Sequence, residues 1–378
     1  HLSLRRQRQM CIRDRSNDPT SIATTAPVGA LYLKSSITGR AYTTGTGSGT
    51  WTQRTGSGSY NWYSIASSSD GTKLAAVVYG GYIYTSTDSG ATWTQRTGSG
   101  SYNWYSIASS SDGTKLAAVV YGGYIYTSTD SGATWTQRTG SGSRSWRSIA
   151  SSSDGTKLVA VVSFGYIYTS TDSGVNWTQR PGAGSLQWYS IASSSDGTKL
   201  VAGAWGEYLY TSADSGATWT QRAGVGNQNW NSIASSSDGT KLIAAGYGSY
   251  IYTSTDSGVN WTQKTNVGDY PGFESYRGVA SSSDGAKLAV ATQGGYIWIS
   301  TDLGATWTKQ TGAGSRNWYS IASSSDGTNL AVVPLNDYIY TYTLPISNAN
   351  LTSAQKWANI FTATNSNPVT AITISNIY

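Results

Sequence analysis

Short apolar and polar runs alternate along this chain in a pattern that repeats about every 42 residues. In one repeat, residues 62–67 alternate around Ile65, residues 73–78 are almost continuously apolar, and residues 82–86 alternate again. Period-two alternation predicts half-buried strands, and a short apolar run predicts a strand covered on both faces. A fourth segment, 92–96, is centred on a tryptophan, and glycine-containing turns separate all four. Each repeat is therefore predicted to form four short antiparallel strands.

The turn marker Ser-Ser-Ser-Asp-Gly shows how often the unit recurs. Its aspartates follow one another at intervals of 42 residues, apart from one interval of 46: Asp70, Asp112, Asp154, Asp196, Asp238, Asp284 and Asp326. One such unit has two hydrophobic faces and cannot bury either alone, so neighbouring units must stack. Four antiparallel strands per stacked unit are typical of a propeller blade.

We therefore expect an all-β fold, a seven-bladed β-propeller of four-stranded antiparallel blades over residues 31–343. The last unit lacks its fourth strand, and the orphan strand around Trp51 is predicted to complete that blade by pairing with the strand around Tyr340. Residues 31–44 also align weakly with a second and third strand, so eight blades remain an alternative. Residues 17–30 are expected to be a linker and residues 344–378 a non-repeat extension.

Residues 1–16 resemble translated sequencing-adapter readthrough and are set aside as a probable artefact or a disordered tail. They contain the chain's single Met, Cys and His, together with five Arg and one Asp, and without them the net charge falls from +6 to +2. The basic character thus belongs mostly to this segment, and nucleic-acid binding is not expected. The true N-terminus is expected to be missing, and no apolar run is long enough to span a bilayer.

The chemistry open to the repeats is narrow. From Asn17 onward the chain has neither Cys nor His, which excludes a thiol nucleophile, an imidazole base and a Cys/His metal site there. Nearly all carboxylates in that part belong to repeated turns, and those that remain are Asp18, Glu207, Asp269, Glu274 and Asp337. A glycosidase needs two carboxylates that face one bond. We therefore expect no catalytic residue, no metal and no cofactor.

A second repeated turn reads Ser-x-Asp-x-Gly-x-x-Trp, as in Ser86 to Trp93. It resembles the Asp-box of the BNR (bacterial neuraminidase) repeat family, and the regular layout is most similar to the photosystem II stability/assembly factor and to sortilin-type propellers. The resemblance implies a structural role for the turn aspartates, which is also what short Asx turns favour. These Asp-box residues are Asp88, Asp130, Asp172, Asp214, Asp256 and Asp302.

Comparing the repeats with one another indicates a candidate binding rim. Both aspartate turns hardly change, whereas the hairpin tip after the second strand and the linker before the first strand do change. Aromatic and arginine residues are favoured at recognition surfaces. The candidate rim residues are Tyr60, Tyr79, Tyr102, Tyr121, Arg144, Phe164, Trp205, Tyr247 and Arg316. The alternative is drift in unconstrained turns.

These observations predict a non-enzymatic scaffold that binds a protein partner, as in assembly-factor-like BNR proteins. A multivalent carbohydrate-binding lectin is the first alternative, and a glycoside hydrolase of the sialidase or xyloglucanase type is the second. The repeated tryptophans, such as Trp62 and Trp104, could stack on sugars, but one large aromatic per blade interface favours a core role. We expect a monomer in an extracellular or other exported compartment.

Overall fold

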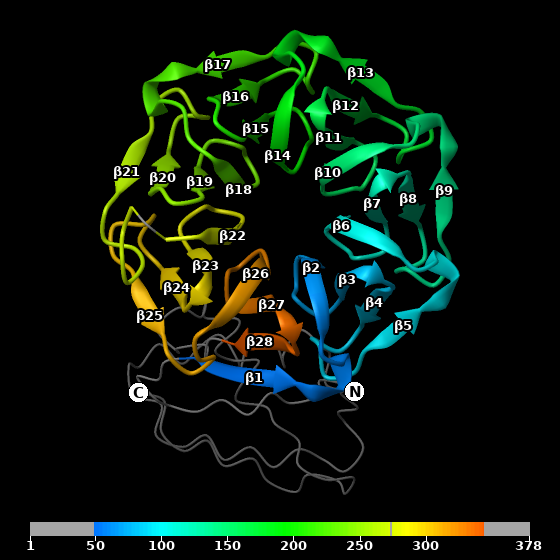
Figure 1. Cartoon of the computed structure of the whole chain (residues 1–378), viewed down its shortest axis with the longest axis horizontal. Coiled ribbons are helices and arrows are strands. Elements are labelled where there is room, and N and C mark those ends of the chain that lie inside the picture. Colours follow the sequence, from blue (N-terminus) through cyan, green and yellow to red (C-terminus); the bar gives the residue numbers. More distant parts are fainter. Residues whose placement is uncertain (1–48, 273, 344–378) are drawn as a thin grey trace, which may run out of the picture. The chain divides into compact units, whose positions relative to one another are not determined.

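The computed structural model describes residues 49–272 and 274–343. The predicted tail 1–16, linker 17–30 and extension 344–378 lie outside these residues, as does the segment 31–44 on which the eight-blade alternative depends. The described part is built almost entirely from short antiparallel strands, in four-stranded groups that stand radially around a central axis (Figure 1). Its few helices are single 3₁₀ turns, so no helix in the described ranges could cross a membrane.

Each group has the predicted order of strands, with the first strand nearest the axis and the fourth outermost (Figure 1). The first strands are β2 (Tyr60–Ser67), β6 (Tyr102–Ser109), β10 (Arg144–Ser151), β14 (Leu186–Ser193), β18 (Trp230–Ser235), β22 (Tyr276–Ser281) and β26 (Arg316–Ser323). The second strands are β3 (Leu74–Gly81), β7 (Leu116–Gly123), β11 (Leu158–Gly165), β15 (Leu200–Ala204), β19 (Leu242–Gly246), β23 (Leu288–Gly295) and β27 (Asn329–Asp337).

The outer half of each group consists of shorter strands. The third strands are β4 (Ile83–Ser86), β8 (Ile125–Ser128), β12 (Ile167–Ser170), β16 (Leu209–Ser212), β20 (Ile251–Ser254), β24 (Ile297–Ser300) and β28 (Ile339–Thr343). The fourth strands are β5 (Thr94–Arg96), β9 (Thr136–Arg138), β13 (Thr178–Arg180), β17 (Thr220–Arg222), β21 (Thr262–Lys264), β25 (Thr308–Gln310) and β1 (Thr50–Arg54). The 3₁₀ turns in the linkers are η1 (Thr55–Ser57), η2 (Thr97–Ser99), η3 (Thr139–Ser141), η4 (Pro181–Ala183) and η5 (Ala223–Val225).

Strand β1 completes the group that contains the C-terminal strands, as the sequence predicts. It pairs antiparallel with β28, with Gln53 opposite Tyr340 and Trp51 opposite Tyr342. The rings of Trp51 and Tyr342 lie 4.8 Å apart. The first and last parts of the described chain are therefore joined in one sheet, and this pairing closes the circle of strand groups.

The core lies between neighbouring groups. The tryptophans of the first strands are fully buried, which confirms their predicted core role: Trp62, Trp104, Trp146, Trp188, Trp230 and Trp318. Six of the clusters join such a tryptophan to the second strands on both sides, as Trp104 does with Val77 of the preceding group and Val120 of its own. In the seventh cluster the buried Tyr276 takes this place. Large apolar residues at this repeated position exclude water from every interface, so each group stabilises the next.

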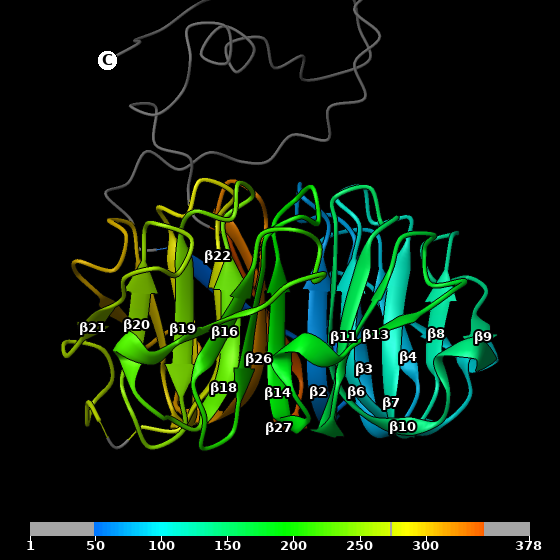
Figure 2. The same cartoon turned by 90° about the horizontal axis from the view of Figure 1, so that it is seen from above.

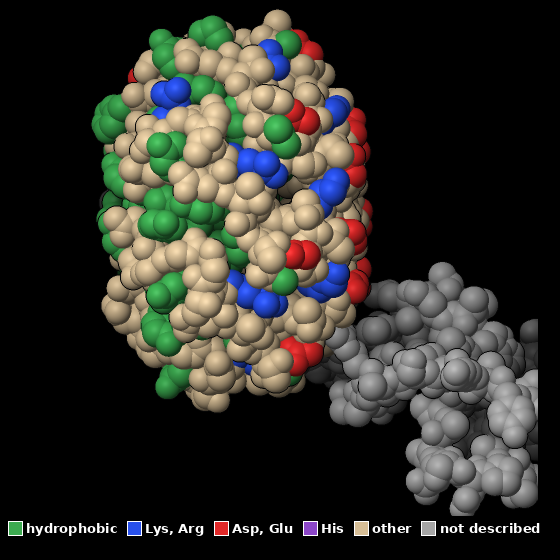
Figure 3. Space-filling model, turned by 90° about the vertical axis from the view of Figure 1, so that its right-hand side faces the viewer, with side chains coloured by type: hydrophobic (Ala, Val, Ile, Leu, Met, Phe, Trp, Pro, Cys, Tyr) green, Lys and Arg blue, Asp and Glu red, His purple; other side chains and the backbone are tan. Residues whose placement is uncertain are grey.

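The strands run along the axis, and their connections form two opposite faces (Figure 2). We call the face with the turns 67–72 and 86–93, and their counterparts in the other groups, the turn face. The face with the tips between second and third strands and the linkers before first strands is the tip face. Figure 3 shows acidic side chains along one rim of the disc and hydrophobic side chains gathered along the other.

A continuous circle of backbone hydrogen bonds ties the turn face together. The Ser69 N–H donates to the Ser111 carbonyl at 2.7 Å, and the N–H of Ser325 donates to the Ser69 carbonyl at the same distance. The intervening links run through the corresponding serines of each group: Ser111, Ser153, Ser195, Ser237 and Ser283. Since each bond satisfies a turn amide and carbonyl that no strand pairs, the unchanging serine sequence has a direct structural reason.

Candidate binding face

The predicted rim residues lie on the tip face, where each hairpin tip pairs with the linker of the following group. Tyr79 is opposite Asn103, and Gly81 is opposite Tyr102. The same arrangement places Arg144 opposite Gly123 and Ser145 opposite Tyr121. This pairing brings the two variable positions of neighbouring repeats side by side on one surface.

The linker residues of the rim lean outward and cover the third strand of their own group. The ring centroids of Tyr60 and Tyr84 are 5.5 Å apart, and Tyr102 and Tyr126 repeat this contact at 5.6 Å. Arginine takes the same place in two groups, where Arg144 lies 4.8 Å above the Tyr168 ring and Arg316 lies 4.5 Å above the Tyr340 ring. Tyr60 and Tyr102 nevertheless keep 41% of their surface exposed. These linker side chains thus pack on their own group and still leave part of their surface exposed for contact with a ligand.

The tip residues of the rim lean inward, toward the axis. Tyr79 stacks on Tyr63 at 4.7 Å, and Trp205 packs against Tyr189 at 5.0 Å. Tyr121 and Tyr247 make similar inward contacts, with Tyr105 and with the guanidinium of Arg277. Phe164 has no such ring contact within the described residues and is the most exposed large apolar side chain there, at 75%.

These inward contacts reveal a set of central residues that sequence reasoning missed. Each directly follows the buried aromatic residue of a first strand: Tyr63, Tyr105, Arg147, Tyr189, Asn231, Arg277 and Tyr319. The register slips at this position, for example between Trp62 and Ser64, so Tyr63 sits in a β-bulge. A bulge re-aims a side chain out of the ordinary alternation. The sequence signal was present, since this position varies between Tyr, Arg and Asn while its neighbours hardly change.

The central residues of different groups meet around the axis. Tyr63 contacts Tyr105 at 5.0 Å and Tyr319 at 4.5 Å between ring centroids. Arg147 lies between two rings, 4.4 Å from the centroid of Tyr105 and 3.8 Å from that of Tyr189. We call the seven residues of this set, together with the inward-leaning tips Tyr79, Tyr121, Trp205 and Tyr247, the central cluster.

Two positive charges in this cluster have no acidic partner among the described residues. Arg147 makes cation–π contacts with Tyr105 and Tyr189 and interacts with the Tyr105 hydroxyl. Arg277 lies 5.4 Å from the Tyr319 ring and donates from Nε to Gln293 Oε1 at 2.7 Å. The two ion pairs of the described chain, Lys309–Asp269 and Arg316–Asp337, involve neither residue. The middle of the tip face therefore offers guanidinium groups that an anion can neutralise.

The tyrosines around these guanidiniums stay neutral. Burial raises the pKa of Tyr105, although the charge of Arg147 opposes the rise. Burial likewise raises the pKa of Tyr319 and of Tyr63. Neutral hydroxyls can both donate and accept hydrogen bonds, so the central cluster combines aromatic faces, hydroxyl groups and positive charge.

The Asp-box residues, by contrast, are occupied by their own turns. Asp88 accepts hydrogen bonds from the Thr92 N–H at 2.8 Å and from the Thr92 hydroxyl at 2.6 Å. The Trp93 indole N–H donates to the Gly90 carbonyl at 3.1 Å and fastens the turn to its strand. The backbone bond recurs at Asp130, Asp172, Asp214, Asp256 and Asp302. The side-chain donor is again a threonine hydroxyl, except at Asp172 and Asp256, where the side-chain amides of Asn176 and Asn260 donate instead.

The remaining carboxylates do not converge either. Glu274 Oε1 accepts the N–H groups of Asp269 and Tyr270. These bonds hold together the loop between β21 and β22, which lies in the one repeat interval of 46 residues. Asp269 pairs with Lys309 at 2.7 Å, and Asp337 pairs with Arg316 at 2.7 Å. Asp18 lies outside the described residues. In residues 49–272 and 274–343 no group of three or more acidic, His or Cys side chains could hold a metal ion.

Comparison with protein-family models gives no match, and comparison with curated protein sequences gives none either. Similar solved structures include one described as YCF48 bound to D1 peptide, with 18% identity, a TM-score of 0.60, and coverage of 78% of this chain and 96% of that one. YCF48 from Cyanidioschyzon merolae is 17% identical, with a TM-score of 0.62 and coverage of 80% and 100%.

An enzyme is also among the similar structures. The GH74 xyloglucanase from Xanthomonas campestris is 15% identical, with a TM-score of 0.61, and the match covers 78% of this chain but 53% of that one. At these identities the likeness concerns the fold, and both enzymatic and non-enzymatic propellers share it. The strand order, the radial stacking and these similarities together identify the described part as a β-propeller.

Proposed function

We propose that this chain is a seven-bladed β-propeller that acts as a non-enzymatic scaffold and binds a protein partner on its tip face. The partner that fits best presents an extended segment with a carboxylate, from Asp, Glu or a chain end. Its carboxylate would meet Arg147 or Arg277, and its apolar side chains would lie on the tyrosines around them. The observation that carries the proposal is the central cluster, where two guanidiniums without acidic partners stand among aromatic rings.

Two properties support this surface over the opposite one. The tip face carries the exposed large aromatics, among them Tyr79, Tyr121 and Phe164. Aromatic and arginine side chains dominate the energetics of protein recognition. The carboxylates of the turn face are already bonded within their turns. The similar propeller YCF48 has been solved with a D1 peptide, which supports the proposal that a polypeptide segment is the ligand.

A selection experiment can test the proposal without a known partner. A phage-displayed random peptide library would be panned on the protein, and the recovered peptides measured by titration calorimetry. We expect the recovered sequences to be rich in Asp and Glu. We expect Arg277→Met to weaken binding by at least about tenfold, because a charge-assisted hydrogen bond is lost. Arg147→Met should have a similar effect.

The matched control is Arg138→Met, which removes an arginine of the outermost strand β9. Arg138 donates to Thr127 Oγ1 at 2.7 Å and is far from the axis in the strand order of its group. It should change peptide affinity by less than twofold. Peptides without acidic residues, or equal losses in the Arg138 and Arg277 variants, would contradict the proposal.

A carbohydrate-binding lectin is the second candidate, favoured by the exposed rings of Tyr60 and Tyr102, which recur at identical positions in successive groups. Repeated exposed tyrosines can stack on sugar rings. A glycan array distinguishes the two: multivalent binding that is insensitive to salt and lost in Tyr60→Ala would replace the protein-binding proposal. Loss of peptide binding at high salt would support the protein-binding proposal, since salt screens guanidinium–carboxylate contacts.

Hydrolase activity is the third candidate, because a xyloglucanase shares the fold. We propose that the chain is not an enzyme, since the two acids of the loop between β21 and β22 are already bonded: Glu274 accepts two backbone N–H groups of the loop, and Asp269 pairs with Lys309. Turnover of xyloglucan or a sialoside that disappears in Glu274→Gln would overturn this view. We also propose that the protein is a monomer in an exported compartment, which light scattering of the purified protein and fractionation of the source cells would test.

A further inference from the structure

On the turn face, one interface between neighbouring groups has a larger cavity than four others of the described chain. Between the group of β15–β17 and the group of β18–β21 lies a cavity of about 220 Å³. The corresponding cavities between β11–β12 and β14–β15, and between β7–β8 and β10–β11, measure about 10 Å³ each. In a molecule built from near-identical repeats, such a difference must come from a local departure in sequence.

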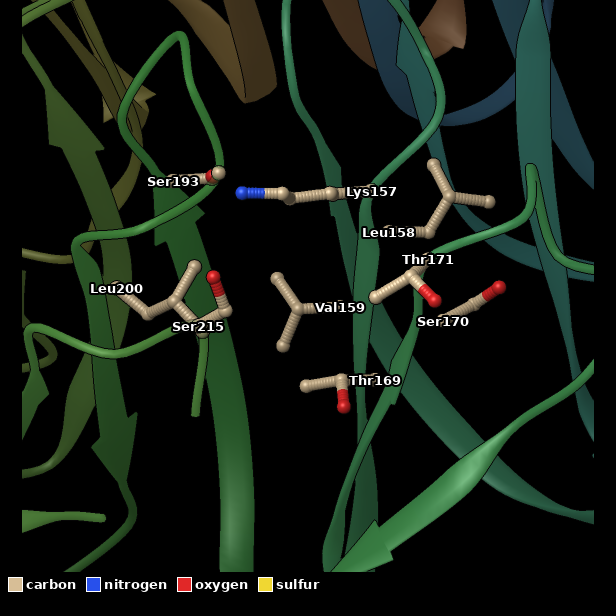
Figure 4. Close-up of a pocket in the computed structure, with 10 residues that line it drawn as sticks. Lys157, Leu158, Val159, Thr169, Ser170, Thr171, Ser193, Leu200 and Ser215 are labelled. Atoms are coloured by element: carbon tan, nitrogen blue, oxygen red, sulfur yellow. The ribbon is translucent and has the colours of Figure 1, made fainter. Parts of the chain in front are cut away.

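The departure is Ala213, which stands where the other complete Asp-box turns have threonine. The equivalent Thr171 and Thr129 line the small cavities of their own interfaces. Figure 4 shows the side chain of Thr171 among the residues that line its cavity, between Val159 and Ser170. The cavity beside Ala213 lacks the threonine hydroxyl and methyl groups on this wall, and its lining also includes Thr220 and Arg222.

The enlarged cavity is lined by two cations and no carboxylate. Lys199 and Arg222 supply the charges, and the hydroxyls of Thr211, Thr220 and Ser257 supply polar groups. Arg222 donates from Nε to Thr211 Oγ1 at 2.8 Å. Its terminal nitrogens donate to no other group in the described chain.

Lys199 also differs from its counterparts. Lys115 and Lys157 each donate from Nζ to the carbonyl of the next group's turn aspartate, both at 2.9 Å. Within residues 49–272 and 274–343, Lys199 Nζ donates to no acceptor. The nearby Asp238 carboxylate is bonded to Ser236 and Thr240 of its own turn. The Lys199 ammonium therefore keeps its hydrogen-bonding capacity at this interface, although its charge also acts on the Asp238 carboxylate.

We propose that the cavity beside Ala213 is a binding site for a small molecule with an oxyanion group, either a carboxylate or a phosphate. Lysine and arginine on one wall bind such a group by charge-assisted hydrogen bonds, and the serine and threonine hydroxyls bind its polar remainder. The volume suits a molecule no larger than a single sugar ring with its acid group. The site lies on the turn face and is independent of the proposed peptide-binding surface.

Titration calorimetry at constant ionic strength tests this site with inorganic phosphate, D-glucuronate and neutral D-glucose as probes. We expect at least one of the two anions to bind with a stoichiometry of one, and glucose to bind at least about tenfold more weakly because it lacks the charge. Binding of phosphate alone, or of glucuronate alone, would assign the oxyanion class. Binding of glucose as strong as that of the anions, or no binding of either anion, would overturn the proposal.

Two substitutions and a matched control locate the site. Ala213→Thr restores the repeat's own residue and should weaken anion binding by at least about tenfold, because the added methyl and hydroxyl narrow the cavity beside Lys199, while circular dichroism shows an intact fold. Lys199→Met should weaken binding by at least about tenfold. The control Lys157→Met removes the equivalent lysine at the neighbouring interface and should leave the affinity unchanged. Equal losses in the Lys157 and Lys199 variants, or full binding by Ala213→Thr, would place the anion elsewhere and contradict the proposal.

Discussion

The two faces of the disc are made by the same repeats, yet they use their side chains in opposite ways. On the turn face, the carboxylates of Asp130 and its counterparts accept hydrogen bonds from amides and hydroxyls of their own turns. On the tip face, side chains such as Tyr79 and Arg147 contact one another and leave charge and aromatic surface open. Invariant residues within a repeat protein therefore mark internal bonds, and the changing residues mark the surface that a partner can use.

The largest expected difference between the faces is their response to pH. Hydrogen bonds from Thr134 lower the pKa of Asp130 to about 2, and those from Ser152 and Thr156 lower that of Asp154 to about 2. A carboxyl whose pKa is lower in the folded state stabilises the fold above its unfolded pKa near 3.8, and this stability is lost as pH falls toward 2. Because the same shift recurs around the ring, we expect unfolding between about pH 4 and pH 2.

For the tip face we expect a loss of stability at alkaline pH. Burial raises the pKa of Tyr105 above 10.0, so the neutral ring stabilises the fold below that value and the contribution is lost as pH rises through the folded pKa. Melting temperature measured by circular dichroism from pH 2 to 12 checks both limits. The tyrosinate absorbance separates the alkaline transition from the acidic one. A flat profile from pH 2 to 4 would show that the turn carboxylates add nothing to stability.

Substitution of one glycine on each face compares how much stability the packing around a single position contributes. Gly132 of the turn face has φ +83°, and a Cβ there would lie 2.8 Å from Thr85 Cγ2 of the neighbouring group. Gly122 of the tip face has φ +74°, but a Cβ would meet nothing within 4 Å. We expect Gly132→Ala to lower the free energy of unfolding by about 3 kcal/mol, from backbone strain plus a clash, and Gly122→Ala by about 1 kcal/mol from strain alone.

Urea denaturation of both variants measures this difference, with equal m-values as the condition for comparing them. Equal losses of stability in the two variants would mean that the packing of the turn face against the next group contributes little. A larger loss in Gly122→Ala would reverse the comparison.

The fold could be predicted because the repeats serve as an alignment of the chain with itself. Positions that hardly change have the same core or turn role in every group, so one interpretation applies to all of them. Examples are Asp70, whose aspartate recurs in each unit, and Trp62, whose place stays aromatic. The closing strand β1 was predictable for the same reason, since Thr50–Arg54 has the sequence of a fourth strand and the last unit lacks one. Comparing the repeats thus made it possible to predict the pairing of β1 with β28, whose strands lie at opposite ends of the described chain.

The candidate sites were harder to predict because they depend on geometry that alternation does not encode. Simple alternation places Tyr63 on the same side as Ile65, whereas the bulge beside Trp62 turns it toward its neighbours around the axis. The change from threonine to Ala213 was visible in the sequence, but whether a missing methyl and hydroxyl leave a void depends on how the next group packs. Both features required the positions of residues from two or more groups.

A smaller effect is expected from removing one turn carboxylate. Asp130→Ala deletes the acceptor of the Thr134 N–H and hydroxyl bonds, at 2.9 and 2.6 Å. We expect the free energy of unfolding to fall by about 1–2 kcal/mol, because the site is exposed and water replaces part of the loss. Asp130→Asn keeps an oxygen acceptor for the Thr134 N–H and should therefore lose less free energy of unfolding than Asp130→Ala. A loss in the Asn variant as large as that in the Ala variant would mean that charge, and not the acceptor, stabilises the turn.

The smallest effect is expected at Phe164, at the tip between β11 and β12. Its side chain is 75% exposed, so substitution by serine removes little buried apolar surface, and the free energy of unfolding should change by less than about 0.5 kcal/mol. Its φ of +55° is unfavourable for phenylalanine and for serine alike, so backbone strain should cancel in the comparison. A loss above about 1 kcal/mol in urea denaturation would show that Phe164 is packed in solution, as the rim tyrosines are. A neutral result with weaker binding of selected peptides would assign this ring to the partner, because a side chain that contributes nothing to stability but something to affinity belongs to a recognition surface.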